Sequence, residues 1–311
     1  MSIISIHNVT KRYANHTALS EVSIEVPDQS IFGLLGPNGA GKTSLIRIIN
    51  QITGPDEGEI FFNGEKLSPH HVSRIGYLPE ERGLYRKMEV GEQALYLAQL
   101  KGLSRSEALK KLKYWFEKFE IISWWKKKVE ELSKGMQQKV QFIVTVLHQP
   151  DLLILDEPFT GFDPINTNLV RDELLELKKN GTTIILSTHR MESVEEMCSH
   201  IALINKSKKI LEGVVKEIRK QHGTQTYEVQ YSGNNIAFAN ALGSNLKLMD
   251  VNNDHEYVVS KIQSLSNHSP NEILKTLLPH VEIHSFRELL PTMNEIFIRS
   301  VNPTVSEHEL A

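Results

Sequence analysis

Cysteine is almost absent from this 311-residue sequence, because Cys198 is the only one. No disulfide can form within the chain, which is typical of a protein from a reducing compartment. Long apolar runs are also missing: QFIVTVL and DLLIL are among the longest, far short of the roughly 20 residues that span a bilayer. We therefore expect a chain that is soluble on its own, although docking onto a membrane partner stays open.

A secretory signal and a strong charge bias are missing as well. The first residues, MSIISIHNVTKRY, lack the basic start and apolar core of a signal peptide. The net charge is −3, so no global basic field indicates a nucleic-acid partner. What is present is an ordinary globular composition, with 40% hydrophobic and 23% charged residues. The length suggests two domains.

Residues 1–220 alternate short apolar runs with amphipathic stretches. The helical stretches between several of the runs predict a mostly parallel α/β sheet. Between about 86 and 150 a helical insertion interrupts the pattern; its second helix, SEALKKLKYWFEKFEI, has Ser104 or Ser106 as its cap. The apolar runs predict buried strands over 31–36, 75–78, 152–155, 183–187 and 201–204.

A different texture begins near residue 222, where QHGTQTYEVQYSGNN is polar and rich in turn residues. The segments that follow, from TYEVQY to PTMNEIFIRSV, predict a small α+β domain over 223–302. Its last helix, after Pro291, is apolar and is a candidate to pack on the small sheet. Residues 303–311 are expected to form a frayed tail.

The segment GPNGAGKT, residues 36–43, fits the pattern G-x-x-x-x-G-K-[ST] between a predicted strand and a predicted helix. Its glycines let backbone N–H groups turn toward phosphate oxygens, Lys42 can reach the β- and γ-phosphates, and Thr43 can offer its hydroxyl to Mg²⁺. The alternative is a tight turn without a ligand. The candidate nucleotide-binding residues here are Gly36, Pro37, Asn38, Gly39, Ala40, Gly41, Lys42, Thr43 and Ser44.

Two acidic residues, Asp156 and Glu157, follow the buried run LLIL. In open α/β sheets the carboxyl ends of strands face the ligand crevice. Beside a phosphate-binding loop, Asp156 is the candidate ligand of Mg²⁺, through water. Glu157 is the candidate group that orients or deprotonates the attacking water. Adjacent acids after a strand also occur in plain solvated turns, which is the alternative.

The stretch LSKGMQQKV, residues 132–140, predicts a helix with Ser133 as its N-cap. A helix N-terminus with a serine and a nearby glycine, here Gly135, is also a site for an anion. The run before it, WKKKVEELS, supplies no such anion beyond two glutamates. An ordinary capped helix is the alternative.

In their order along the chain, these motifs resemble those of the nucleotide-binding subunits of ABC (ATP-binding cassette) transporters, over residues 3–218. Tyr13 occupies the position of the aromatic residue that stacks on adenine. GPNGAGKTS resembles the Walker A loop, GYLPEERGLY the Q-loop, LSKGMQQKV the signature motif and LLILDEP Walker B. TGFDP resembles the D-loop, and LSTHR carries the switch histidine, His189. The resemblance implies a P-loop NTPase fold, an ABC ATPase domain over 1–220 with a mixed sheet and a helical subdomain.

The resemblance further implies ATP hydrolysis, with ATP and Mg²⁺ as cofactors. It implies a second ATPase subunit in a head-to-tail homodimer, so that Ser133 and Gly135 complete the phosphate site of the partner. His189 would contact the γ-phosphate and help to place Glu157, although a histidine after a buried strand can also be structural. ATP would join the subunits, and hydrolysis would release them.

Two motifs depart from the family pattern. The Q-loop position holds Glu80 instead of glutamine; a carboxylate can still ligate Mg²⁺, but it adds negative charge near the phosphates. In the signature, Lys134 replaces a glycine and Met136 replaces a glutamine. Lys134 either adds positive charge near ATP or points into solvent, and we favour solvent.

A membrane partner follows from the same resemblance. In the family, a short helix of an integral membrane permease enters a cleft formed by the Q-loop and the helical subdomain, here residues 80–85 and 86–100. The chain would then be cytoplasmic and peripheral on the inner face of the cell membrane. The ending SFRELLPTMNEIFIRSV resembles accessory domains of bacterial sodium-efflux and drug- or peptide-export systems, so we expect export. The alternatives are a soluble ABC-type ATPase that remodels a nucleic-acid or ribosomal complex, and a sensor ATPase.

Overall fold

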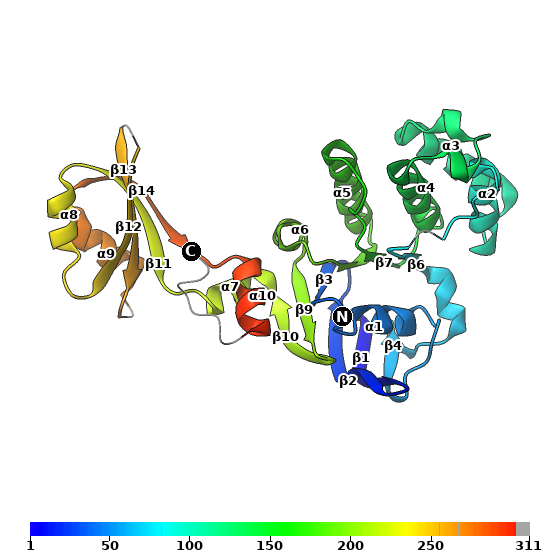
Figure 1. Cartoon of the computed structure of the whole chain (residues 1–311), viewed down its shortest axis with the longest axis horizontal. Helices are drawn as coiled ribbons and strands as arrows, with labels where there is room; N and C mark the ends of the chain where they lie inside the picture. The colour runs from blue at the N-terminus through cyan, green and yellow to red at the C-terminus, as the bar shows by residue number, and fades with distance from the viewer. Residues whose placement is uncertain (82, 255, 267, 303–311) are drawn as a thin grey trace. The chain divides into compact units, whose positions relative to one another are not determined.

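The computed structural model describes residues 1–302 apart from 82, 255 and 267, and it divides into two compact units (Figure 1). The first unit is Met1–Val215 and the second begins at Lys216, slightly before the expected boundary, because most of helix α7 (Val215–Gln221) groups with the second unit. The expected tail, 303–311, lies outside the described residues. Within the described ranges, no helix has the length and hydropathy that crossing a membrane requires.

The main sheet of the first unit has six strands in the order β10–β9–β3–β8–β7–β6. Neighbouring strands are parallel except β9 and β10, which are antiparallel, so the sheet is mixed and the α/β class is confirmed. Continuous apolar runs form its parallel strands because both faces of such a sheet are covered. The strands are β3 (Ile31–Leu35), β6 (Ile75–Leu78), β7 (Leu152–Asp156), β8 (Thr183–Ser187), β9 (His200–Asn205) and β10 (Lys208–Val214).

A second, antiparallel sheet in the order β2–β1–β4–β5 is one that the sequence analysis does not predict. Its two long strands mix buried and exposed residues, and bulges shift the register between them. They therefore lack the continuous apolar runs that indicate the strands of the main sheet. The strands are β1 (Ser2–Tyr13), β2 (His16–Pro27), β4 (Glu57–Phe62) and β5 (Glu65–Lys66).

Helix α1 (Lys42–Ile49) shares one hydrophobic core with both sheets. Leu45 and Ile48 of α1 belong to the same buried cluster as Ile6 of β1 and Ile154 of β7. Fully burying a side chain of this kind stabilises the fold by about 1.5–3 kcal/mol. This packing fixes the start of α1, and with it the loop over residues 36–41, against the ends of the main-sheet strands.

The predicted insertion contains three helices, gathered beyond the β6 and β7 side of the main sheet (Figure 1). Ser104 rather than Ser106 caps α3: the Ser104 side chain and Glu107 form a reciprocal capping box. The helices of the insertion are α2 (Val90–Leu100), α3 (Arg105–Lys118) and α4 (Lys134–Val146), with the 3-10 turns η2 (Ile122–Trp124) and η3 (Val129–Glu131). Elsewhere the first unit has η1 (Pro69–Arg74), α5 (Pro164–Lys179) and α6 (Met191–Met197).

The second unit contains an antiparallel sheet in the order β12–β13–β11–β14, which makes it the small α+β domain that the sequence predicts. Its core joins Tyr231 of β11 to Phe238 of α8, with their rings stacked at 4.1 Å, and includes Ile273 of α9. The elements are β11 (Thr226–Ser232), α8 (Asn235–Ala241), β12 (Leu246–Asp254), β13 (Tyr257–Ser264), α9 (Pro270–Leu277), β14 (Glu282–Leu289) and α10 (Met293–Val301).

Helix α10 does not pack as the sequence analysis expects. Its buried residues, Met293 and Ile296, lie outside the core of the small sheet. Instead, Arg219 of α7 donates a hydrogen bond from Nε to the carbonyl oxygen of Pro291 at 2.9 Å, and α10 lies beside α7 (Figure 1). An amphipathic pattern predicts that one helix face is buried, but it does not specify the surface that covers it.

Candidate active site

Three strand ends meet at one edge of the main sheet. β3, β8 and β7 are adjacent and parallel, so the loop after β3, the acids at the end of β7 and the histidine after β8 come together. A pocket of about 270 Å³ opens there. The residues singled out in the sequence that line it are Tyr13, Asn38, Gly39, Ala40, Gly41, Lys42, Thr43, Ser44, Glu80, Asp156, Glu157 and His189.

The loop over 36–41 has a backbone conformation that favours glycine. Gly41 has a φ of +117°, and a Cβ there would lie 2.3 Å from the carbonyl oxygen of Ala18. Lys42 folds back over the loop, where its Nζ donates to the carbonyl oxygens of Gly36 at 2.6 Å and Pro37 at 3.1 Å. Gly36 and Pro37 do not line the pocket themselves; their carbonyl oxygens bind Lys42, which does line it.

Glu157 is held by the residues that follow β8. Its carboxylate accepts hydrogen bonds from the backbone N–H of His189 at 2.9 Å and from the hydroxyl of Thr188 at 3.2 Å. Its Oε1 also lies 2.6 Å from His189 Nδ1. The φ of Glu157 is +49°, which is uncommon for a residue with a side chain. Such strain persists where the surroundings fix it, and it gathers at functional sites.

Three carboxylates share the pocket with a single lysine. Burial raises the pKa of Asp156, and the charges of Glu80 and Glu157 raise it further. Burial lowers the pKa of Lys42, whereas the three carboxylates oppose that change. Carboxylate and hydroxyl oxygens are the ligands that Mg²⁺ prefers. The donor set of Thr43, Glu80 and Asp156 in a pocket with surplus negative charge therefore fits a magnesium ion.

Ser133 and Gly135 are not among the residues that line this pocket. Ser133 is the N-cap of α4, as predicted, and its hydroxyl accepts from the N–H of Met136 at 3.3 Å. A Cβ on Gly135 would lie 3.0 Å from the carbonyl oxygen of Gly161, so the start of α4 is close to the predicted D-loop of the same chain. Lys134 is exposed at the start of α4.

Two further residues of the pocket lining, His16 and Ala18, belong to none of the motifs recognised in the sequence. Tyr13 pairs with His16 across the turn between β1 and β2, so both side chains reach the rim of the pocket. Tyr13 is 40% exposed and is therefore open to a flat ligand ring. The sequence shows a histidine three positions after Tyr13. Its place in the pocket follows only from the hairpin between β1 and β2, which sets the two residues opposite each other.

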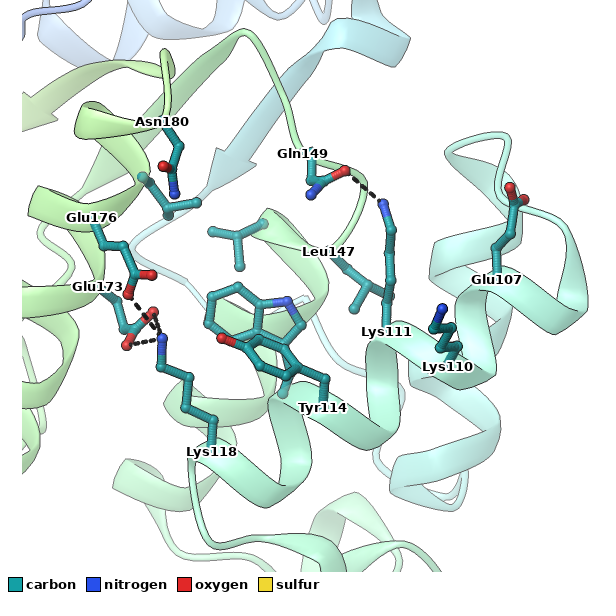
Figure 2. A pocket seen from close by; sticks show the side chains of 13 residues that line it. Glu107, Lys110, Lys111, Tyr114, Lys118, Leu147, Gln149, Glu173, Glu176 and Asn180 are labelled. Carbon is teal, nitrogen blue, oxygen red and sulfur yellow. Dashed lines mark hydrogen bonds and ion pairs between the residues drawn. The ribbon is translucent and has the colours of Figure 1, made fainter.

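A separate cavity of about 500 Å³ lies between α3, the end of α4 and α5 (Figure 2). Lys118 Nζ crosses it to reach the carboxylates of Glu173 at 2.6 Å and Glu176 at 2.9 Å. Lys111 donates to Gln149 at 2.9 Å. Lys118 is therefore paired with two carboxylates and Lys111 with a neutral amide, and none of the predicted site residues lines the cavity. We assign it a structural role in joining the helices.

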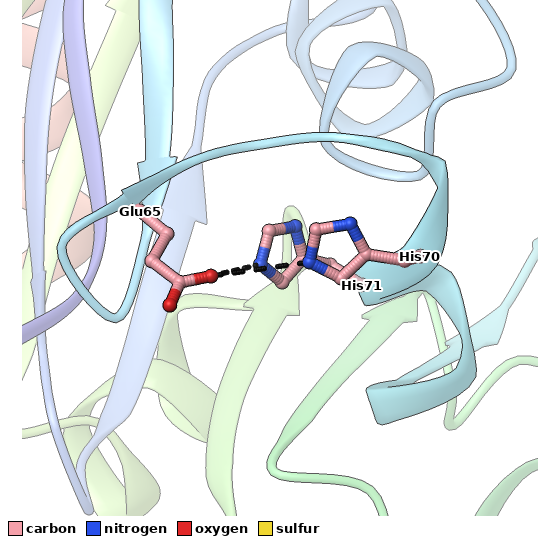
Figure 3. A group of neighbouring side chains, drawn as sticks. All are labelled: Glu65, His70 and His71. Atoms are coloured by element: carbon pink, nitrogen blue, oxygen red, sulfur yellow. Dashed lines mark hydrogen bonds and ion pairs between the residues drawn. The ribbon is translucent and has the colours of Figure 1, made fainter.

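Glu65, His70 and His71 form a cluster beside β5 with the spacing of metal ligands (Figure 3). His71 is buried, and its Nδ1 accepts a hydrogen bond from the N–H of Ser68 at 3.1 Å. A neutral imidazole that accepts at Nδ1 carries its proton on Nε2, which here faces Glu65 at 3.4 Å. A histidine that binds a metal donates from its second nitrogen instead. The geometry favours a hydrogen-bonded cluster over a metal site.

Family comparisons agree with this geometry. The sequence profile of the ABC transporter family matches residues 19–160, and that of the C-terminal domain of DrrA1-3-like ATP-binding proteins matches 213–301. An AAA domain profile (putative AbiEii toxin, type IV TA system) matches 128–195. A solved structure of an ATP-binding subunit of an ABC transporter is 30% identical with a TM-score of 0.66, and the match covers 71% of this chain and 93% of that chain.

Three curated relatives extend the comparison. The ABC transporter ATP-binding protein YhaQ of Bacillus subtilis is 41% identical over 96% of this chain and 98% of its own. The linearmycin resistance ATP-binding protein LnrL of Bacillus subtilis is 28% identical, over 98% and 100%. Nod factor export ATP-binding protein I of Cupriavidus metallidurans is 34% identical, over 70% and 73%. This chain therefore belongs to the ATP-binding subunits of ABC transporters, which hydrolyse ATP to power transport.

Proposed function

We propose that the chain hydrolyses Mg²⁺-bound ATP within a head-to-tail homodimer and drives a separate integral membrane permease that exports a sodium ion, a drug or a peptide. The observation that carries the proposal is one pocket that joins the phosphate loop, the acids after β7 and His189. The chain would act in the cytoplasm, peripheral on the inner face of the cell membrane through the permease.

The pocket suits the phosphates and the base of ATP. The backbone N–H groups of residues 38–44 and the N-terminus of α1 provide donors and positive potential for phosphate oxygens. Lys42 would exchange the carbonyl oxygens of Gly36 and Pro37 for the β- and γ-phosphates, which compete well because they are charged. Tyr13, exposed at the rim, is the residue proposed to stack on adenine.

Mg²⁺, when bound with ATP, supplies positive charge that offsets the charge of the phosphates. Thr43, Glu80 and Asp156 are the residues proposed to hold it, because they bring oxygen donors to the same pocket. The raised pKa of Asp156 supports this role, since burial and neighbouring carboxylates disfavour its charge until a cation is present. Glu80, where the family has glutamine, adds a carboxylate to the site.

Hydrolysis needs a group that orients a water molecule and takes its proton. Glu157 is proposed as this general base, with its carboxylate positioned by the N–H of His189 and the hydroxyl of Thr188. The water oxygen would bond to the γ-phosphorus while the bond to the bridging oxygen of ADP breaks, and the proton would pass to Glu157. His189, 2.6 Å from Glu157, is proposed to contact the γ-phosphate as well.

The homodimer is proposed because two residues that the family resemblance assigns to the phosphate site lie outside the pocket of their own chain. Ser133 and Gly135 lie at the N-terminus of α4, which offers positive potential and a hydroxyl, yet they do not line the nucleotide pocket of their own chain. A head-to-tail partner would bring a second copy of this helix start to the γ-phosphate. Loss of that phosphate would remove the shared contact, so the dimer would open after hydrolysis.

Residues 80–85 and 86–100 are proposed to contact the permease. Glu80 lines the nucleotide pocket, whereas Tyr77 and Pro79, just before it, line a different cavity together with α2 and α4. One short segment of chain therefore reaches both places. A permease helix in that cavity would contact the segment that reaches the nucleotide pocket. It would also contact α4, the helix that begins within the signature motif at residues 132–140.

Export is proposed from the relatives, because LnrL is a linearmycin resistance protein and the Nod factor relative is an export protein. The match of the second unit to the DrrA1-3-like C-terminal domain points the same way. The rival function is a soluble ATPase that remodels a nucleic-acid or ribosomal complex. The net charge of −3 and the presence of one phosphate-binding loop disfavour it. The remaining alternative is a sensor ATPase, in which the second unit would bind a signalling ligand and the transporter would be only a partner.

The deciding experiment is purification of tagged Glu157→Gln protein from gently solubilised native membranes, with ATP and Mg²⁺ present. We expect a protein with several membrane spans in stoichiometric amount, identified by mass spectrometry. Ribosomal or nucleic-acid-associated partners, without a membrane protein, would refute the transport function in favour of the rival.

A further inference from the structure

Ser187, the last residue of β8, lies beside both acids at the end of β7. The two strands are parallel neighbours, and Ser187 pairs with Asp156 in their register. Residues that pair in adjacent strands direct their side chains to the same face of the sheet. The carbonyl oxygen of Ser187 also accepts the N–H of Glu157 at 2.8 Å. Ser187 therefore contacts Glu157 through its main chain and has its side chain on the same face as that of Asp156.

The hydroxyl of Ser187 is enclosed, and its hydrogen-bonding capacity is unused. Ser187 is fully buried, and its Oγ has no hydrogen-bond partner among the described residues. By contrast, the hydroxyl of Ser30, a buried serine just before β3, donates to the carbonyl oxygen of Pro27 at 2.6 Å. Buried polar groups are normally paired, because an unpaired one destabilises the protein. The Ser187 hydroxyl is therefore a donor that is still available to an acceptor.

Asp156 supplies the acceptor. It is only 5% exposed, so few groups other than its neighbours in the sheet can pair with its carboxylate. Burial raises the pKa of Asp156, and the hydroxyl of Ser187 opposes that rise more strongly than the charge of Lys42 does. The hydroxyl is thus close enough to act on the carboxylate. A hydrogen bond from a hydroxyl to a charged carboxylate is short and strong, so the pair forms when Asp156 carries its charge.

We propose that Ser187 is a positioning residue for the magnesium site: its hydroxyl donates to one oxygen of Asp156 and thereby turns the other oxygen toward the metal. Magnesium ions require near-octahedral geometry, so the orientation of each ligand matters. Partners behind a ligating carboxylate fix that orientation. This inference rests on the proposed role of Asp156 in holding Mg²⁺, and it adds the residue that aligns the carboxylate.

The first test measures how much Mg²⁺ tightens the binding of a fluorescent, slowly hydrolysed ATP analogue to the full-length chain. Its affinity is determined with excess Mg²⁺ and again with EDTA, and the ratio of the two values is the tightening. We expect Ser187→Ala to lose roughly tenfold of that ratio, with the affinity in EDTA unchanged. Ser187→Thr keeps the hydroxyl and should restore the ratio. Ser30→Ala removes a buried hydroxyl elsewhere and is the matched control, which should leave the ratio unchanged.

The second test replaces Mg²⁺ with Ca²⁺, which accepts more ligands in a more flexible geometry. Misalignment of one carboxylate should therefore weaken the tightening by Mg²⁺ more than the tightening by Ca²⁺. Asp156→Asn combined with Ser187→Ala should bind no more weakly than Asp156→Asn alone, because the hydroxyl acts through the carboxylate. Melting temperatures show whether the variants fold. Ser187→Cys, similar in size but a weak donor, takes the place of Ser187→Ala if the latter does not fold.

The outcomes separate this inference from the function on which it rests. If Asp156→Asn loses the tightening by Mg²⁺ and Ser187→Ala keeps it, the positioning role is overturned and the magnesium site stands. Equal losses for Mg²⁺ and Ca²⁺, or weaker binding in EDTA, overturn it in favour of a purely structural role for Ser187. Full tightening by Mg²⁺ in Asp156→Asn refutes the proposed magnesium site itself.

Discussion

At the residue scale, Glu157 combines an uncommon backbone φ of +49° with hydrogen bonds from Thr188 and His189. The change Glu157→Gln keeps the size of the side chain but removes its ability to take a proton from water. We expect ATP turnover to fall at least about 100-fold, with ATP affinity little changed, in assays of phosphate release and nucleotide binding. Glu192→Gln, exposed in the first turn of α6, is the control. Near-normal turnover by Glu157→Gln would exclude Glu157 as the base.

Asp156 supports a second prediction at this scale, on stability. Burial, with Glu80 and Glu157, holds its pKa above the unfolded value, so the folded protein retains this proton to higher pH than the unfolded chain does. Stability from this group is therefore present below the unfolded pKa and is lost as pH rises through the folded pKa. We expect Asp156→Asn to stabilise the nucleotide-free protein at pH 7, and the gain to shrink as pH falls toward 4.

Urea unfolding of both proteins at several pH values measures this difference, and Asp172→Asn, at an exposed position of α5, serves as the control. A gain for Asp156→Asn that is independent of pH would contradict the titration argument. Added ATP and Mg²⁺ should reverse the order of stability, because the wild-type carboxylate then has a cation to bind.

Most residues of the pocket could be predicted from sequence, because phosphate and Mg²⁺ chemistry restricts the side chains and their spacing. Lys42, Thr43 and Asp156 follow from motifs beside predicted strands, and all three line the pocket. His16 could not be predicted in this way, because it reaches the pocket through the β1–β2 hairpin. The hydrogen bonds that hold Glu157 also depend on β7 and β8 being neighbours, which no local pattern specifies.

At the scale of elements, the ion pair between α3 and α5 joins the helical insertion to the rest of the first unit (Figure 2). Burial works against the charge of Lys118, but its hydrogen bonds to Glu173 and Glu176 hold its pKa above the usual value. The side chain of Glu173 is only 7% exposed. We expect Lys118→Met to lower the free energy of unfolding by roughly 2–4 kcal/mol, because Glu173 would remain buried without a counter-charge.

Lys113→Met is the matched control for that variant, since its pair with Glu117 spans 3.9 Å between two exposed side chains. Such a pair contributes less than about 0.5 kcal/mol. The double change Lys118→Met with Glu173→Leu should recover much of the loss in urea unfolding. Equal effects of Lys118→Met and Lys113→Met would mean that the α3–α5 pair behaves as an ordinary surface pair.

The start of α4 supports a further prediction on the same scale. Ser133→Ala removes the N-cap of α4. The loss should destabilise the helix by about 1 kcal/mol or less, because the capping hydrogen bond is long, at 3.3 Å. We expect turnover to fall by roughly tenfold or more, while ATP binding by the monomer stays normal. Ser104→Ala removes the cap of α3 instead and should leave turnover unchanged. An equal loss of turnover in both variants would attribute the effect to helix stability.

The elements that the sequence predicts well are those with one clear pattern. β3 and β7 are continuous apolar runs, and α3 has a capping box at Ser104. β14 is not predicted, because its residues are exposed or half-exposed throughout and show no alternation. The packing of α10 beside α7 could not be predicted from the sequence either, because an apolar stripe on a helix does not specify the surface on which it packs.

At the scale of the whole molecule, the proposed dimer places each ATP between Lys42 of one chain and Ser133 of the other. Two mixtures test this arrangement. In the first, Lys42→Ala chains are mixed with Ser133→Glu chains, each inactive alone. A head-to-tail mixed dimer would then hold both defects in one site and leave the other site intact, so we expect ATP turnover to reappear.

In the second mixture, wild-type chains meet an excess of chains that carry both Lys42→Ala and Ser133→Glu. Each site of a head-to-tail mixed dimer then contains one defect, so the excess should suppress wild-type turnover. If each chain completed its own site, both results would reverse: the two single variants would stay inactive together, and the wild-type chain would keep its activity beside the double variant. The pair of mixtures therefore decides between a shared site and a self-contained one, whichever permease the dimer serves.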